Sequence, residues 1–143
     1  MKTKLSPSSA LLALSGFILM GLGLYFVFLR PPLLPEDPRF MGTTPAEIQA
    51  TMPGLLIWLR RVFWVMGGFM FTGGLLTTYI AVTAFQQLAR GARSVIALAG
   101  LTSIGWMAII NFMINSDFKW LLLLFNLPWI MALILSWRES EQA

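Results

Sequence analysis

Acidic and basic side chains that could bind a polar ligand together gather in one segment of the chain. They are Glu36, Asp37, Arg39, Arg60 and Arg61. Carboxylates paired with guanidinium groups form charge-assisted hydrogen bonds, and an ordered set of such pairs beside a cavity can hold a ligand. The simpler interpretation, which we favour, is a solvated turn in which each surface ion pair contributes about 0–1 kcal/mol.

Two asparagines are the best further polar candidates, because they lie in otherwise apolar surroundings. If the chain reverses near residues 116–118, Asn111 and Asn126 lie at depths that differ by about one helical turn. Pro128 frees a backbone carbonyl nearby, so the two amides and the resulting kink could line a small polar pocket. We favour the alternative that each amide makes ordinary interhelical hydrogen bonds of about 0.6 kcal/mol.

The residue types that the chain lacks limit its chemistry. There is no cysteine and no histidine among the 143 residues. Thiolate and imidazole are the usual ligands of haem iron, copper and zinc, and histidine is the commonest general base. The composition therefore excludes a dithiol quinone reductase and an ordinary haem cytochrome as self-contained activities. We predict no catalytic residue, no cofactor and no metal site, and we expect a protein that is not an enzyme.

The elements that position these residues are four long runs without any charged side chain. The runs are Ala10–Leu29, Val62–Ala89, Ser94–Ser116 and Trp120–Trp137. A helix rises about 1.5 Å per residue and a bilayer core is about 30 Å thick, so each run is long enough to cross a membrane. The chain is 57% hydrophobic and 11% charged, whereas soluble domains carry about 25% charged residues.

These runs predict an all-α membrane protein of one domain, residues 1–143. We expect an antiparallel bundle of four transmembrane helices, with an ordered extramembrane loop over residues 30–59 that contains a short helix. The connections at 90–93 and 116–119 are short, so we expect the second and third helices, and the third and fourth, to be antiparallel neighbours. The helices are expected at about 9–29, 60–88, 94–115 and 118–137.

Small residues recur at helical spacing in the first two runs. They are Gly16 and Gly23 in the first run, and Gly67, Gly74 and Thr78 in the second. Small side chains on one face let two helix backbones approach closely. We therefore expect the first two helices to pack tightly against each other. A path for a slender ligand, or an oligomer contact on the same face, are the less favoured alternatives.

The long connection combines a proline-rich stretch with a helix start. Four prolines between residues 31 and 38 predict an extended, non-helical segment. Thr44-Pro45-Ala46-Glu47 has an N-cap, a proline at the first helical position and a glutamate three residues after the cap, so we expect a short helix to about Met52. Pro53-Gly54 should end it. The connection is then an ordered cap on the bilayer surface, with Trp58 at the headgroup layer.

The number of basic residues does not fix the orientation. If the N-terminus lies inside the cell, five basic residues fall on each side of the membrane. Lys2 and Lys4 precede the first run, and the connection with Arg90 and Arg93 is very short; both features favour that side as cytoplasmic. We therefore expect a multi-pass protein of the cell (plasma or inner) membrane with both termini cytoplasmic. The first run is too long for a signal-peptide core and has no cleavage site, so we expect it to be retained.

The segment Pro-Glu-Asp-Pro-Arg-Phe-Met-Gly at residues 35–42 resembles the first external loop of small bacterial four-helix integral membrane proteins that are loosely DoxX-like. The similarity covers that loop and the general layout. It implies a place in the bacterial inner membrane and a component of quinone-linked membrane oxidation, although this chain shows no cofactor ligand of its own.

Three functions follow from these observations. The leading one is a non-enzymatic accessory or interaction subunit in the membrane. The alternatives are the DoxX-like component and a small oligomeric transporter, which is disfavoured because no carboxylate lies within any of the four runs. The expected partners are the lipid bilayer and either a second copy of the chain or another membrane subunit. The ten basic residues are scattered, so we expect no nucleic-acid partner.

Overall fold

The computed structural model describes residues 4–141, and all regular secondary structure within this range is helical. Four stretches are long and apolar enough to cross a membrane, which confirms the predicted helical class and the number of candidate spans. They are α1 (Pro7–Phe28), α4 (Pro53–Ile80) with the π-helical turn η1 (Ala81–Phe85), α5 (Ala92–Gly100) with η2 (Leu101–Gly105) and α6 (Trp106–Met113), and α7 (Lys119–Glu141). Lys2, used above for orientation, lies outside the described residues.

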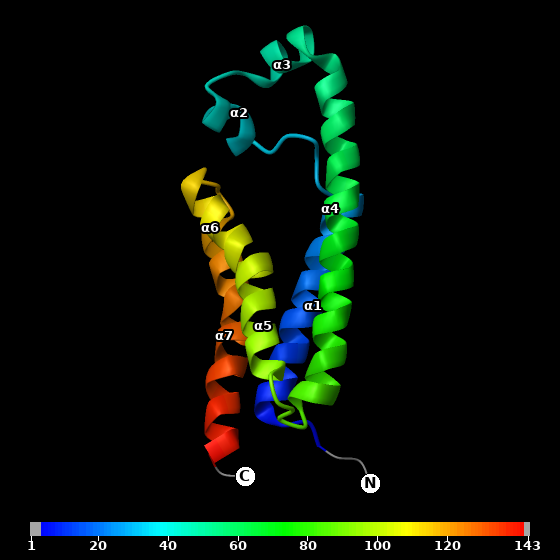
Figure 1. Cartoon of the computed structure of the whole chain (residues 1–143). Helices are drawn as coiled ribbons and strands as arrows, with labels where there is room; N and C mark the ends of the chain where they lie inside the picture. The colour runs from blue at the N-terminus through cyan, green and yellow to red at the C-terminus, as the bar shows by residue number, and fades with distance from the viewer. Residues whose placement is uncertain (1–3, 142–143) are drawn as a thin grey trace.

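Two short helices, α2 (Glu36–Met41) and α3 (Pro45–Thr51), connect α1 to α4. Figure 1 shows them beyond the ends of α1, α6 and α7, where α4 alone reaches up to meet them. The start of α1 and the end of α7 lie together at the opposite end of the molecule. The fold is therefore four long helices with a small helical cap at one end.

The helix α2 contradicts the prediction that the proline-rich stretch is entirely extended. Pro35 is the N-cap and Pro38 lies in the first helical turn. The first N–H groups of a helix have no acceptor within the helix, so proline costs nothing there. Glu36 and Asp37 add negative charge at the positive end of the helix dipole, and Gly42 ends the helix with a left-handed φ of 70°.

The start of α3 follows the capping chemistry of its sequence. The Thr44 hydroxyl accepts from the Glu47 N–H, and the Glu47 carboxylate accepts from the Thr44 N–H. Ile48 is buried, and α3 packs against α4. The predicted start of the next helix, near residue 60, was wrong by several residues. Pro53 does not separate two elements but occupies the first position of α4, where its fixed φ suits a helix.

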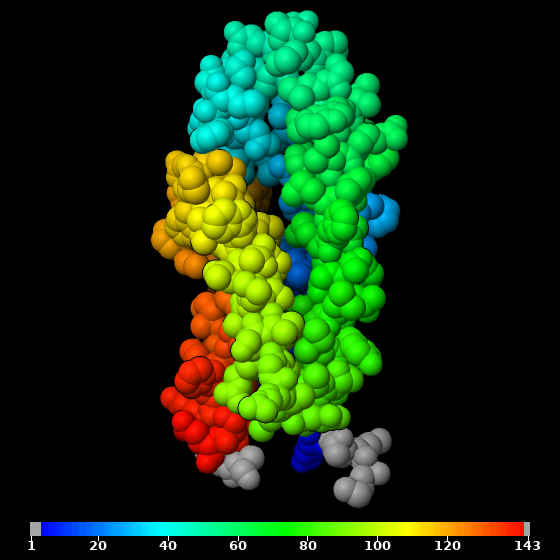
Figure 2. All heavy atoms as spheres, in the orientation of Figure 1, coloured from blue at the N-terminus to red at the C-terminus, as the bar shows by residue number. Residues whose placement is uncertain are grey.

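The helix α1 is the centre of the arrangement. It packs along α4 on one side and along α7 on the other, while the third long helix packs mainly on α7. A buried core of Leu12, Ala81, Phe85 and neighbouring apolar residues lies toward the end away from the cap. The second and third helices, expected to be neighbours, meet near their connection, through η1 and α5. Figure 2 shows a gap between α4 and α6 toward the cap.

The glycine faces of α1 and α4 lie against each other. A Cβ atom added to Gly16 would lie 2.7 Å from the Gly74 carbonyl oxygen, and one added to Gly23 would lie 2.7 Å from the Gly67 carbonyl oxygen. Thr78 also faces Gly16, and its hydroxyl donates to the Gly74 carbonyl at 2.9 Å. No side chain fits between the two backbones at these positions, so the pairing of α1 with α4 depends on glycine.

Candidate functional site at the cap

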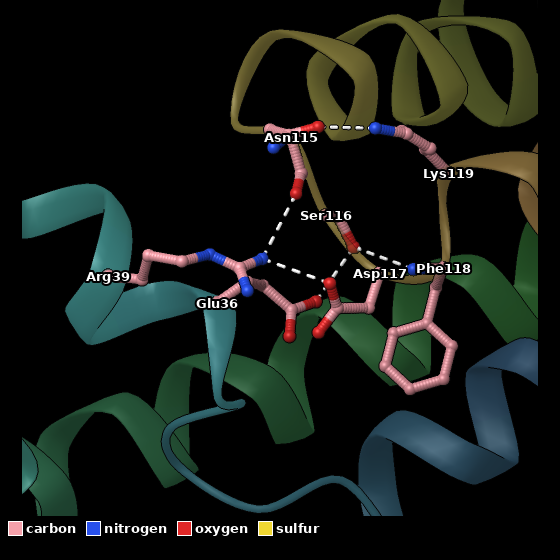
Figure 3. Close-up of polar contacts among 7 residues, drawn as sticks. All are labelled: Glu36, Arg39, Asn115, Ser116, Asp117, Phe118 and Lys119. Carbon is pink, nitrogen blue, oxygen red and sulfur yellow. Dashed lines mark hydrogen bonds and ion pairs between the residues drawn. The ribbon is translucent and has the colours of Figure 1, made fainter.

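An exposed ion pair joins α2 to the turn between α6 and α7. The Arg39 guanidinium donates to the Asp117 carboxylate at 3.0 Å and to the Asn115 carbonyl at 3.2 Å. Figure 3 shows the arginine reaching across from α2 to this turn. Both side chains are more than half exposed, so solvent weakens their attraction.

A buried carboxylate lies beside this pair. Glu36 is 1% exposed, and its Oε1 accepts from the Ser116 hydroxyl at 2.7 Å. The Ser116 oxygen in turn accepts from the Phe118 N–H at 3.1 Å, and Figure 3 shows this chain of contacts. The second carboxylate oxygen of Glu36 is buried and has no hydrogen-bond partner among residues 4–141. The favoured interpretation of Glu36 as part of a solvated turn was therefore wrong.

The neighbouring carboxylate, Asp37, faces the end of α1. Its Oδ2 lies 3.5 Å from the Arg30 guanidinium and accepts from the Leu34 N–H at 2.8 Å. The Arg30 guanidinium also lies over the Phe63 ring of α4, 3.5 Å from its centroid. Burial lowers the pKa of Arg30 from its ordinary value, while the nearby Asp37 opposes that shift. Arg30 thus ties the cap to both α1 and α4.

The two remaining candidates, Arg60 and Arg61, lie apart from this cluster. Both are exposed, and neither forms an ion pair within the described part of the chain. The Arg61 guanidinium lies 5.0 Å from the Trp64 ring centroid instead. Only Glu36, Asp37 and Arg39 of the five predicted residues therefore belong to the site.

Sequence reasoning missed the partners of these three residues. Ser116 is 80 residues from Glu36, and Asp117 is 78 residues from Arg39. The available signal was topological, because four helices that alternate in direction bring their first and third connections to the same end. The resulting site, which we call the cap lock, consists of Arg30, Glu36, Asp37, Arg39, Ser116 and Asp117.

The cap lock can hold two segments together, and its chemistry fits that task. Two contacts join α2 to the α6–α7 turn, and a third joins it to Arg30 at the end of α1. One of the three includes the buried carboxylate of Glu36. Among residues 4–141 there is no group of three or more histidine, cysteine or acidic side chains placed to hold a metal ion. The geometry therefore points to anchoring of the cap.

The two asparagines of the long apolar helices donate hydrogen bonds to backbone carbonyls. The Asn126 amide donates to the Ile104 carbonyl of η2 at 3.3 Å and to the Leu122 carbonyl of its own helix at 2.8 Å. The Asn111 amide donates within its own helix, to the Met107 carbonyl at 2.9 Å. The favoured interpretation, an interhelical hydrogen bond for each amide, therefore fits Asn126, which joins α7 to η2, and was wrong for Asn111.

Trp129 makes a second contact between α7 and the third long helix. The Trp129 indole N–H donates to the Ile96 carbonyl at 3.0 Å, and its ring lies where a Cβ atom of Gly100 would stand. The enclosed space beside it measures about 10 Å³ and is bounded by residues from all four long helices. A space of that size is about that of one water-sized sphere, so this region is a packed core.

Comparisons with known proteins found no relative of this chain. No protein-family model, no curated protein and no solved structure matches the chain.

Proposed function

We propose that this chain is a non-enzymatic, four-pass integral membrane protein whose long helices form an antiparallel bundle, and that it serves as an accessory subunit of another membrane protein. Its binding surface consists of the cap, that is α2 and α3, together with residues 53–61 of α4. Four apolar helices and the glycine pairing of α1 with α4 support the bundle. The side chains that this surface exposes support the partner role.

The second span is longer than a membrane requires. The stretch Pro53–Phe85 contains 33 residues, which corresponds to about 50 Å of helix against a bilayer core of about 30 Å. The contact between Arg30 and Phe63 aligns the end of α1 with this part of α4. Residues 53–59 of α4 then lie about 6–15 Å beyond the level of Phe63, from the headgroup layer outward.

Exposed apolar residues on this projection are the observation that carries the proposal. Ile57 is 65% exposed and Trp58 is 60% exposed. Apolar side chains beyond the bilayer core have no acyl chains to cover them, and such patches mark protein–protein interfaces. Arg60 and Arg61 are exposed at the edge of the patch. The partner surface that fits is therefore apolar with acidic side chains at its rim.

The cap lock supports this role because it fixes the surface before a partner arrives. Ordering a flexible segment on binding consumes part of the interaction free energy, and a segment that is already ordered avoids that cost. Glu36 and Arg39 hold α2 against the α6–α7 turn, and α3, with its buried Ile48, packs against α4.

Photo-crosslinking in native membranes tests the proposal. A crosslinking amino acid in place of Trp58 should form adducts with a different protein chain, whereas one in place of the 76% exposed Phe69 should form adducts with lipid. Lipid adducts alone at position 58 would show that this segment lies in the bilayer and would overturn the proposal. Adducts with a second copy of the chain would favour an oligomer over an accessory subunit.

The proposed orientation is tested by cysteine labelling, for which the absence of native cysteine is convenient. Gln49→Cys in α3 and Ala89→Cys in the α4–α5 connection both introduce thiols at exposed positions. With both termini cytoplasmic, an impermeant maleimide should label position 49 in intact cells and position 89 only after permeabilisation. The reverse pattern would invert the topology.

A further inference from the structure

An open groove lies at the end of the molecule away from the cap. It encloses about 700 Å³ between the α4–α5 connection, the first turns of α5 and the last turns of α7. Its walls combine two arginines with apolar and aromatic side chains. The residues that define its character are Arg90, Arg93, Ala97, Leu133 and Trp137.

The polar part of the groove has the chemistry of a phosphate site. Arg90 and Arg93 both line it, and no acidic side chain does. Within residues 4–141 neither guanidinium forms an ion pair, so their charge is not neutralised there. Guanidinium groups match the geometry of phosphate oxygens and bind them with paired hydrogen bonds. The groove therefore fits an anionic phosphate group.

The aromatic part of the groove places it at the membrane interface. Trp137 is 65% exposed, and the Arg93 guanidinium lies 5.9 Å from its ring centroid. Tryptophan side chains concentrate at the headgroup level, where the ring contacts both lipid and water. The two arginines and the tryptophan thus lie where lipid phosphates lie.

The apolar part of the groove continues toward the interior of the bilayer. Ala97 is four residues further along α5 than Arg93, and Leu133 is four residues before Trp137 on α7, so each lies about 6 Å deeper. The groove is thus charged at its mouth and apolar one turn further in. A phospholipid has the same order of phosphate and acyl chain.

We propose that this groove is a binding site for an anionic phospholipid. The lipid phosphate lies between Arg90 and Arg93, and an acyl chain follows the apolar wall formed by Ala97 and Leu133. Two uncompensated arginines select a net negative headgroup over a zwitterionic one. The site is independent of the proposed partner surface, which lies at the opposite end of the molecule.

Lipid binding by the purified chain in detergent tests the site. Phosphatidylglycerol added to mixed micelles should raise the Tm of the wild-type protein more than phosphatidylcholine does, and native mass spectrometry should retain phosphatidylglycerol on the protein. Replacing both residues, Arg90→Gln with Arg93→Gln, should abolish the Tm difference and weaken phosphatidylglycerol binding about tenfold or more. The matched control, Arg60→Gln with Arg61→Gln, removes the same charge at the other interface and should retain the difference.

Further variants keep the test decisive if the glutamine pair folds poorly. Arg90→Lys with Arg93→Lys preserves the charge but loses the paired geometry, so it should weaken binding to an intermediate degree. Trp137→Leu should weaken binding without removing the preference for phosphatidylglycerol. Equal effects of the two lipids on the wild type, or an equal loss in the control pair, would overturn the proposal. An equal Tm shift with inorganic phosphate alone would show a general anion site and would also overturn it.

Discussion

Gly16 of α1 and Gly74 of α4 lie so close that a Cβ atom on Gly74 would stand 2.5 Å from the carbonyl oxygen of Gly16. The pair of Gly23 and Gly67 repeats this contact two helical turns further along. Such approach brings backbone atoms into dispersion contact and allows weak Cα–H···O bonds. The contact also makes the helix pair sensitive to a single methyl group.

Gly74→Ala should therefore lower the free energy of unfolding by about 1–3 kcal/mol, because the added methyl has only backbone atoms and the Met20 side chain to displace. Gly68→Ala is the matched control on the same helix, since nothing lies within 4 Å of its added Cβ. The control should be neutral or slightly stabilising, because alanine favours helix. Denaturant unfolding in detergent measures both variants, and equal effects would contradict the close helix pair.

Among the contacts of the cap lock, the hydrogen bond from Ser116 to Glu36 should contribute most to the stability of the cap. Ser116→Ala leaves the buried Glu36 carboxylate and the Phe118 N–H without this partner, which costs about 1–3 kcal/mol. Hydrogen exchange in α2 should become faster. Ser140→Ala removes a hydroxyl that is exposed and bonds its own helix, so it should leave α2 unchanged. Unchanged exchange in Ser116→Ala would contradict the assigned role.

The ion pair of Arg39 with Asp117 should contribute much less than the buried contact. Both side chains are more than half exposed, so a double-mutant cycle with Arg39→Ala and Asp117→Ala should give a coupling of about 0–1 kcal/mol. Salt should reduce it further. A coupling that is larger than the effect of Ser116→Ala, or that does not change with salt, would reverse this order.

Glu47 should titrate below its ordinary range. Hydrogen bonds from the Thr43 hydroxyl and from the Thr44 N–H and hydroxyl lower the pKa of its carboxyl. Because the folded-state pKa lies below the unfolded value, its contribution to α3 is present above the unfolded pKa and is lost as pH falls through the folded pKa.

An NMR titration of the Glu47 carboxyl carbon measures this shift. Thr44→Ala should raise the pKa because it removes the hydroxyl donor, whereas Thr44→Ser keeps the hydroxyl and should keep the pKa low. Amide exchange in α3 should rise in the same acidic range in which Glu47 becomes protonated. A pKa that is unaffected by Thr44→Ala would contradict the capping contact.

The cap shows why local patterns were informative at some positions and wrong at others. The start of α3 depends on side chains three residues apart, so Thr44 and Glu47 could be assigned from the sequence. The number of prolines predicted an extended segment, but the position of each proline in its turn decides whether a helix forms. Pro38 lies in the first turn of α2 and Pro53 at the first position of α4, where no backbone donor is needed.

The sequence by itself determined the four apolar helices, since the length and charge of each run are local properties, and it identified the glycines of the first two. Only the tertiary structure decided the partners of Glu36 and Arg39 and the groove between Arg93 and Trp137. Those contacts join residues far apart in the chain. Their formation depends on how α1 packs between α4 and α7, and side-chain shape over the whole molecule sets that packing.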